Sequence, residues 1–172
     1  TGSVGGGLAR HLANAGAKLT LADIDHARAA CLAEELGATA VPAEAIMQVE
    51  CDVFSPCALG AIFDDESIAA LRALVVAGGA NNQLARPEHG DALMQRGILY
   101  APDYVINAGG IIAVTYEYLA RRDGTARDVS QIEASIAGIP ERLTAIWERA
   151  RIEGTAPSRI ADAMAQKLIG RD

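Results

Sequence analysis

A glycine cluster followed by a helix, a strand and an acid is the feature that most constrains this fold. The chain opens with TGSVGGGL, in which Gly2 and Gly5 are three residues apart. Apolar residues at helical spacing follow, and then the strand-like segment LTLAD ends on Asp23. A glycine turn that opens a helix, with an acid about 20 residues later at the end of the second strand, is the dinucleotide-binding fingerprint G-x-G-x-x-G. Gly2 and Gly5 hold its second and third glycine positions, and the first would precede Thr1.

Each residue type in this motif has a physical reason. A side chain at Gly2 would keep the backbone away from a pyrophosphate, and Gly5 lets the helix pack close to the strand. The free N–H groups near residues 3–5 face the anion at the helix N-terminus. Asp23 accepts hydrogen bonds from both adenine-ribose hydroxyls and repels a 2′-phosphate, which favours NAD over NADP. Asp25 is an alternative ribose ligand, although its position also fits a helix cap.

Strand-like and helical segments alternate along the first two thirds of the chain. Strands are predicted at 17–22, 39–41, 51–54, 73–77, 98–100 and 104–106, and helices at 4–15, 25–36, 44–48, 67–70 and 87–95. From Ala108 the pattern is helical, with breaks at 123–124 and 154–157, one long helix ending near Ile152 and a last helix ending at Leu168. This predicts an α/β fold, a Rossmann-type doubly wound parallel sheet with a truncated first strand and a helical C-terminal extension. We expect one domain, 1–172, with its dinucleotide-binding core at 1–107 and the extension at 108–172.

Composition and charge agree with this class and exclude others. Hydrophobic residues make up 51% of the chain and aromatic residues only 4%, as in α/β proteins built on aliphatic strands. The net charge of −7 argues against a nucleic-acid partner, because such binding depends on clustered Lys and Arg. No apolar run reaches the roughly 18 residues of a membrane span. An odd number of cysteines, three, favours a reducing cytoplasm, and neither Cys nor His shows metal-ligand spacing.

Three later segments carry a resemblance to a known family. The segments CDVFSPCALG (51–60), AGGANNQL (77–84) and GILYAPDYVINAGG (97–110) closely resemble the C-terminal domain of the Glu/Leu/Phe/Val dehydrogenase superfamily. The leucine, phenylalanine and valine branch fits best. The resemblance implies a homo-oligomeric enzyme that uses NAD to deaminate an apolar L-amino acid (leucine, valine or phenylalanine) reversibly, giving its 2-oxo acid and ammonia.

The resemblance also implies roles for single residues. The loop Pro56–Leu59 would lie against NAD through its backbone, Asn82 would hold the substrate or nicotinamide end, and Asn107 would bind the nicotinamide carboxamide. Ile111 and Val114 would line the substrate side-chain pocket, with plain core packing as the alternative. The expected cofactor-binding residues are Gly2, Ser3, Val4, Gly5, Asp23, Cys57, Ala58, Leu59, Ala80, Asn82 and Asn107; the expected substrate pocket is Asn82, Ile111 and Val114.

The two lysines of the sequence bear on whether the chain contains catalytic residues. In the family, the general-base lysine, its assisting carboxylate and a carboxylate-binding lysine lie in an N-terminal domain. Lys18 and Lys167, the two lysines of this sequence, match neither position. We therefore expect the catalytic domain to be absent, no catalytic residue in this chain, and two strands left unpaired beside the truncated first strand. Two alternatives stay open: a glutamate dehydrogenase, and a stand-alone NAD-binding sensor or scaffold module.

Overall fold

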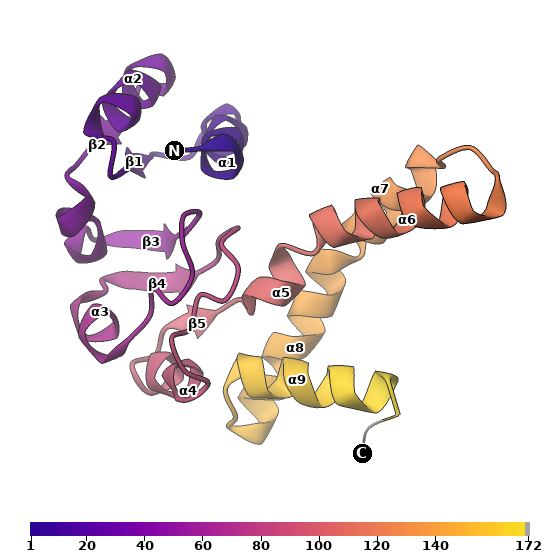
Figure 1. The fold of residues 1–172 in the computed structure, drawn as a ribbon. Coiled ribbons are helices and arrows are strands. Elements are labelled where there is room, and N and C mark those ends of the chain that lie inside the picture. Colours follow the sequence, from indigo (N-terminus) through magenta and orange to yellow (C-terminus); the bar gives the residue numbers. More distant parts are fainter. Residues whose placement is uncertain (171–172) are drawn as a thin grey trace.

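Parallel strand pairs form the centre of the fold. The computed structural model describes residues 1–170 and contains two sheets. In the first, β1 (Thr20–Leu21) pairs with β2 (Thr39–Ala40). In the second, β4 (Ala73–Val76) lies between β3 (Cys51–Phe54) and β5 (Leu99–Tyr100) (Figure 1). All of these pairings are parallel, so the α/β class and the parallel arrangement predicted from the sequence are confirmed.

Helices connect the strands and make up the whole C-terminal part. They are α1 (Ser3–Asn14), α2 (His26–Leu36), the 3₁₀ helix η1 (Ala43–Gln48), α3 (Asp65–Ala70), α4 (Glu88–Gln95), α5 (Asp103–Ile106), α6 (Gly109–Asp123), α7 (Val129–Ala137), α8 (Ile139–Glu153) and α9 (Pro157–Leu168). Figure 1 shows α1 and α2 beside the first sheet, and α3 and α4 beside the second. Within residues 1–170, none of these helices is both long enough and apolar enough to cross a bilayer.

The doubly wound sheet is not continuous. Among the described residues, β1 pairs only with β2, and β3 pairs only with β4. This agrees with the expectation that two neighbouring strands lack a common partner. β1, predicted at 17–22, is also shorter than predicted, since it covers Thr20–Leu21.

Two apolar clusters support the second sheet. The first packs Phe54, Phe63, Leu71, Leu93 and Tyr100 between the strands and the helices α3 and α4. In it, the rings of Phe54 and Phe63 meet edge to face, with centroids 6.1 Å apart.

The second cluster joins the end of β5 to the C-terminal helices. Ala101 and Val105 pack against Leu143 and Ile146 of α8 and against Ile160 of α9. The carboxyl end of β5 is therefore held by the two C-terminal helices.

Two elements differ from the sequence prediction. Residues 104–106 were predicted as a strand but form helix α5, in which the amides of Val105 and Ile106 donate to the carbonyl of Pro102. Their β-branched and aromatic side chains favour a strand locally, but tertiary contacts decide: the Tyr104 hydroxyl donates to Asp162 of α9 at 2.6 Å.

The long helix predicted up to Ile152 is also wrong, because it is divided into α7 and α8 at Gly138. Pro140 stands at the first turn of α8. A proline lacks the N–H that would continue a helix, and its ring clashes with the carbonyl four residues earlier.

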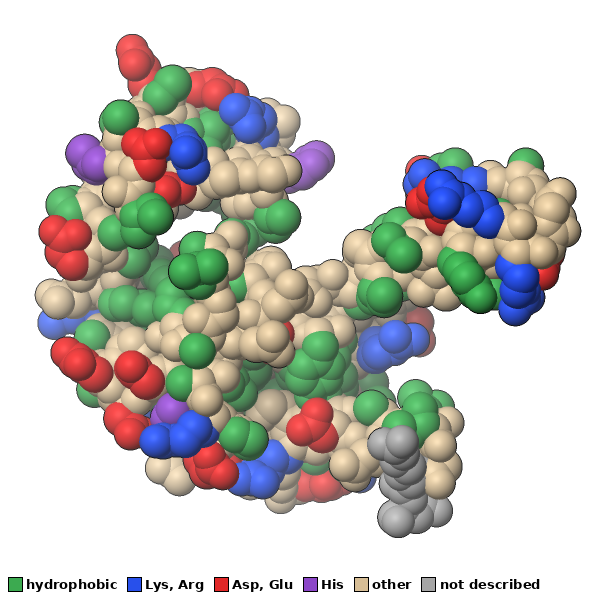
Figure 2. Space-filling model, viewed as in Figure 1, with side chains coloured by type: hydrophobic (Ala, Val, Ile, Leu, Met, Phe, Trp, Pro, Cys, Tyr) green, Lys and Arg blue, Asp and Glu red, His purple; other side chains and the backbone are tan. Residues whose placement is uncertain are grey.

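Helices α6 and α7 form an arm that projects from the rest of the molecule (Figures 1 and 2). They pack on each other, and the hydroxyls of Tyr116 and Ser135 lie 3.0 Å apart. No residue of α6 is buried, and Ile132 is the buried residue of α7. The arm therefore presents a large surface to solvent in this structure.

The loops after β3 and β4 approach each other closely at Gly78. A Cβ added there would lie 2.5 Å from the nitrogen of Pro56, which is a main-chain atom that cannot move away cheaply. We expect Gly78→Ala to lower the free energy of unfolding by about 1–3 kcal/mol, as other overpacking substitutions do. Urea denaturation of the two proteins measures the change.

Gly7→Ala is the matched control. A Cβ at Gly7 meets no atom within 4 Å, and Gly7 lies inside α1. Since alanine is the better helix former by about 1 kcal/mol, this variant should be as stable as the parent or more so. Equal stability of the two alanine variants would contradict the close approach.

Candidate cofactor site

The glycine turn lies at the N-terminus of α1, as predicted. Gly2 is the N-cap residue, and no side chain caps the helix there. Open space surrounds the position where a Cβ of Gly2 would stand. The first-turn amides of a helix have no partner within the helix, and they carry its positive dipole end. This end of α1 is therefore chemically suited to hold an anion.

Asp23 follows β1 and binds back to the start of the chain. Its carboxylate accepts hydrogen bonds from the Thr1 hydroxyl at 2.6 Å and from the Asp25 amide at 3.0 Å. These hydrogen bonds hold the carboxylate of Asp23 directly beside the glycine turn.

Asp25 serves as a helix cap, which was one of its two predicted roles. Its carboxylate accepts a hydrogen bond from the Arg28 amide at 3.2 Å and caps α2. The same carboxylate lies 3.3 Å from the Arg28 guanidinium. Both interactions direct Asp25 toward its own helix.

The loops after β3 and β4 meet the start of α1. A Cβ at Gly5 would lie 3.1 Å from Cβ of Cys57, and a Cβ at Gly79 would lie 2.8 Å from Val4. The amide of Ala80 donates to the carbonyl of Pro56 at 2.9 Å. The structure thus brings together three segments that lie far apart in the sequence.

The outer part of the first loop is open to solvent. Leu59 is 84% exposed. Ala58 is exposed as well. Neither side chain is occupied by packing within the described chain, so both are accessible to a ligand.

Two asparagines follow β4, and a third follows α5. The side-chain amide of Asn107 donates to the side-chain oxygen of Asn81 at 2.7 Å. The backbone amide of Asn82 donates to a carboxylate oxygen of Asp103 at 2.6 Å, and the backbone carbonyl of Asn82 accepts from the Ala61 amide at 2.6 Å. These groups lie past the carboxyl ends of β4 and β5, the edge at which open parallel sheets bind ligands.

The structure places Ile111 and Val114 on the arm rather than among these loops. Their exposures are 66% and 59%. Core packing, one of the two roles considered for them, is therefore wrong. Tyr118, also exposed, follows at helical spacing and extends the same stripe of α6.

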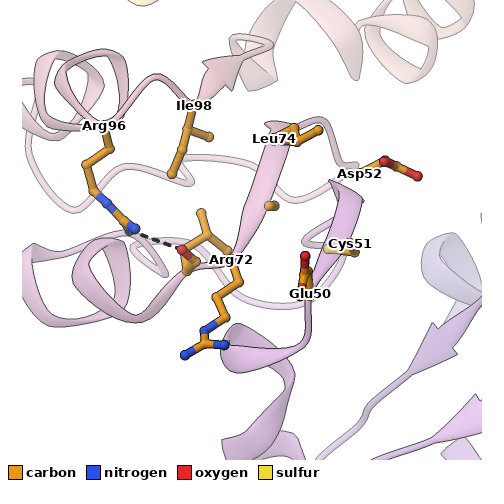
Figure 3. Close-up of a pocket in the computed structure, with 9 residues that line it drawn as sticks. Glu50, Cys51, Asp52, Arg72, Leu74, Arg96 and Ile98 are labelled. Carbon is orange, nitrogen blue, oxygen red and sulfur yellow. Dashed lines mark hydrogen bonds between the residues drawn. The ribbon is translucent and has the colours of Figure 1, made fainter.

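A cavity of about 460 Å³ opens at the opposite edge of the second sheet (Figure 3). Cys51, Ala73 and Ile98, which begin or precede the three strands, line it together with the charged Glu50, Asp52, Arg72 and Arg96. The Arg96 guanidinium donates to the main-chain carbonyls of Ile68 and Leu71. Arg96 therefore serves as a structural link between α4 and α3 at the edge away from the asparagines.

Sequence reasoning missed Asn81 and Asp103 as parts of the site. Both lie in segments that the sequence singles out, AGGANNQL and APDYVINAGG. The segments indicated where the site lies, but no periodicity reveals that the Asp103 carboxylate turns inward to the Asn82 amide. Within residues 1–170, no group of three or more potential metal-binding side chains is found.

Comparison with known proteins gives a consistent result. The family model for Glutamate/Leucine/Phenylalanine/Valine dehydrogenase matches residues 5–168. A leucine dehydrogenase of Geobacillus stearothermophilus is 46% identical over 98% of this chain and 44% of its own length. A leucine dehydrogenase of Thermoactinomyces intermedius is 45% identical over 94% of this chain and 43% of its own length. The chain thus spans less than half the length of these relatives.

A solved structure agrees with the sequence comparisons. The crystal structure of an L-tryptophan dehydrogenase from Nostoc punctiforme superposes with a TM-score of 0.91. It is 36% identical, and the match covers 100% of this chain and 51% of the other. The chain belongs to the Glutamate/Leucine/Phenylalanine/Valine dehydrogenase family.

Proposed function

We propose that the full-length protein is an NAD-dependent dehydrogenase that converts an apolar L-amino acid and water into the 2-oxo acid and ammonia. The observation that carries the proposal is the convergence of the glycine turn of α1, the two loops after β3 and β4, and Asn107. Such a convergence at the carboxyl edge of a parallel sheet suits a dinucleotide.

The cofactor would lie across these segments. The amides of Ser3, Val4 and Gly5 suit the pyrophosphate, and Asp23 suits the ribose hydroxyls. Cys57, Ala58, Leu59 and Ala80 would face the middle of the dinucleotide, while Asn82 and Asn107 would bind its nicotinamide end. When bound, the nicotinamide supplies the hydride acceptor. An amide side chain both donates and accepts, which fits a carboxamide partner.

The substrate would lie between Asn82 and the arm. Its apolar side chain would contact Ile111 and Val114, whose exposure leaves them available. The apolar character of both residues favours leucine, valine or phenylalanine over glutamate. Asn82 would orient the reacting end of the substrate.

The proton acceptor would be supplied by a domain other than residues 1–172. Lys18 is exposed just before β1, and Lys167 is exposed on α9. Neither is hydrogen-bonded to the asparagines among the interactions of residues 1–170. We propose that residues 1–107 form the dinucleotide-binding core, that 108–172 form a helical extension, and that the catalytic lysines belong to another domain. We also propose that the protein is a homo-oligomer and that it is located in the reducing environment of the cytoplasm.

A substrate panel tests the reaction class. We expect the full-length protein to reduce NAD⁺ with leucine, valine or phenylalanine at a kcat/KM at least about tenfold above that with glutamate, because apolar pockets exclude a charged side chain. Absorbance of NADH at saturating NAD⁺ measures the rate. Preference for glutamate would support a glutamate dehydrogenase. Binding of NADH with no turnover of any amino acid would support a sensor or scaffold.

Asp23→Ser tests the cofactor choice. Loss of a charged hydrogen-bond acceptor costs about 1.5–3 kcal/mol, so NADH should bind about 10- to 100-fold more weakly. NADPH should gain affinity relative to NADH, because its 2′-phosphate no longer meets a carboxylate. Fluorescence titration gives both dissociation constants.

Asp25→Asn is the control for Asp23→Ser, since asparagine caps a helix as well as aspartate does. It should leave both dissociation constants within about twofold of the parent values. If Asp23→Ser weakens NADH and NADPH by the same factor, its effect is a damaged turn and the role in ribose recognition is wrong.

Val114→Ala tests the substrate pocket. Removing two methyl groups should enlarge the pocket and raise the ratio of kcat/KM for phenylalanine over valine by about tenfold, within the range that small apolar changes produce. Val129→Ala, at an exposed valine of α7 outside the predicted pocket, should leave the ratio unchanged. Equal ratios in the two variants would place Val114 outside the pocket.

A further inference from the structure

Asp103 is a buried carboxylate that binds the backbone of the loop after β4, which carries Asn81 and Asn82. It begins α5, directly past β5, and is 7% exposed. Its Oδ2 accepts the hydrogen bond from the Asn82 amide at 2.6 Å, and its Oδ1 accepts one from the Tyr100 hydroxyl at 2.8 Å. A buried carboxylate is costly unless it is hydrogen-bonded, so both donors stabilise it where it lies.

The backbone at Asn82 needs such a tether. Its φ is +52°, a left-handed conformation that is uncommon outside glycine, although asparagine tolerates it better than most residues. The surrounding structure must hold residues in that region. Here the Asn82 amide is held by Asp103 and its carbonyl by the Ala61 amide. The N–H and C=O groups of Asn82 are thus both held, which sets the direction of its Cα–Cβ bond.

Tyr100 fixes the carboxylate in turn. Tyr100 is 1% exposed, and burial together with the neighbouring Asp103 raises the pKa of its hydroxyl far above the usual value. The hydroxyl therefore stays protonated and donates. The Tyr100 carbonyl accepts from the indole of Trp147 at 2.9 Å, which connects the network to α8.

We propose that Asp103 is a positioning residue for the reaction: its carboxylate, held by Tyr100, sets the left-handed backbone of Asn82 and so aims the Asn82 side chain at the substrate or nicotinamide end. This inference rests on the proposed function for the role of Asn82. Asp103 itself contacts neither substrate nor cofactor in this scheme and acts through Asn82.

A double-mutant cycle in the full-length protein separates positioning from general stabilisation. Asp103→Ala should lower kcat/KM for the preferred amino acid by about 10- to 100-fold, the effect of losing a hydrogen bond to a charged group. Asn82→Gly removes the side chain but permits the same backbone. If Asp103 acts through Asn82, adding Asp103→Ala to Asn82→Gly should cost less than about threefold more. Losses that multiply would overturn the proposal.

Two further variants test the geometry. Asp103→Asn keeps an oxygen for the Asn82 amide and should recover most of the activity. Tyr100→Phe removes the other donor to the carboxylate and leaves the bond to Asn82, so its loss should stay below about fivefold. NADH affinity in Asp103→Ala should fall no further than it does in Asn82→Gly, because the glycine turn and Asp23 are untouched in both variants. A larger fall in Asp103→Ala would indicate general damage and contradict the assignment.

Hydrogen exchange tests the tether without any assay of activity. In Asp103→Ala the Asn82 amide should exchange at least about tenfold faster, whereas amides of α9 should not change. An unchanged Asn82 amide would overturn the inference even if the protein proves to be a dehydrogenase. Absence of amino-acid oxidation in the parent protein would instead refute the proposed function, and the exchange result would still decide whether Asp103 holds Asn82.

Discussion

The close approach of the loops after β3 and β4 is the constraint on which the rest of the site depends. Gly78 lies against the main chain of Pro56, and the Ala80 amide donates to the Pro56 carbonyl. The Ser55 hydroxyl donates to the Ala77 carbonyl at 2.6 Å in the same place. Parallel strands end at one edge, but their loops diverge unless contacts of this kind hold them together. Here the contacts bring Cys57 to the start of α1.

A second consequence follows for the asparagines. Because Pro56 and its neighbours fix the start of the β4 loop, the end of that loop needs separate support. Gln83 supplies part of it: its side chain is fully buried and donates to the carbonyls of Gly78 and Ala80. Asp103 and Asn107 supply the rest from beyond β5. The loop is therefore held by its own residues and by the neighbouring strand.

The sequence predicted most elements and the position of the glycine turn because both depend on local patterns. The glycine turn, the acid after β1 and the α2 cap at Asp25 are short-range signals. Residues 104–106 were wrongly predicted as a strand because a tertiary contact overrides their strand propensity. The Tyr104 hydroxyl donates to Asp162 of α9, which lies 58 residues later in the sequence. The role of Asp103 was not predicted because the sequence does not show whether an aspartate is exposed or is buried as a hydrogen-bond acceptor.

On the arm, the local sequence pattern predicts buried side chains, but the structure exposes them. Ile111, Val114 and Tyr118 repeat at helical spacing, a pattern that usually faces a core, yet all three are exposed. Covering an apolar side chain of this size stabilises by about 1.5–3 kcal/mol, so such a stripe favours contact with another apolar surface. The stripe begins shortly after Asn107 and its NAGG segment, in continuity with the candidate site. An exposed apolar stripe of this kind is what the proposed substrate-facing role of Ile111 and Val114 requires.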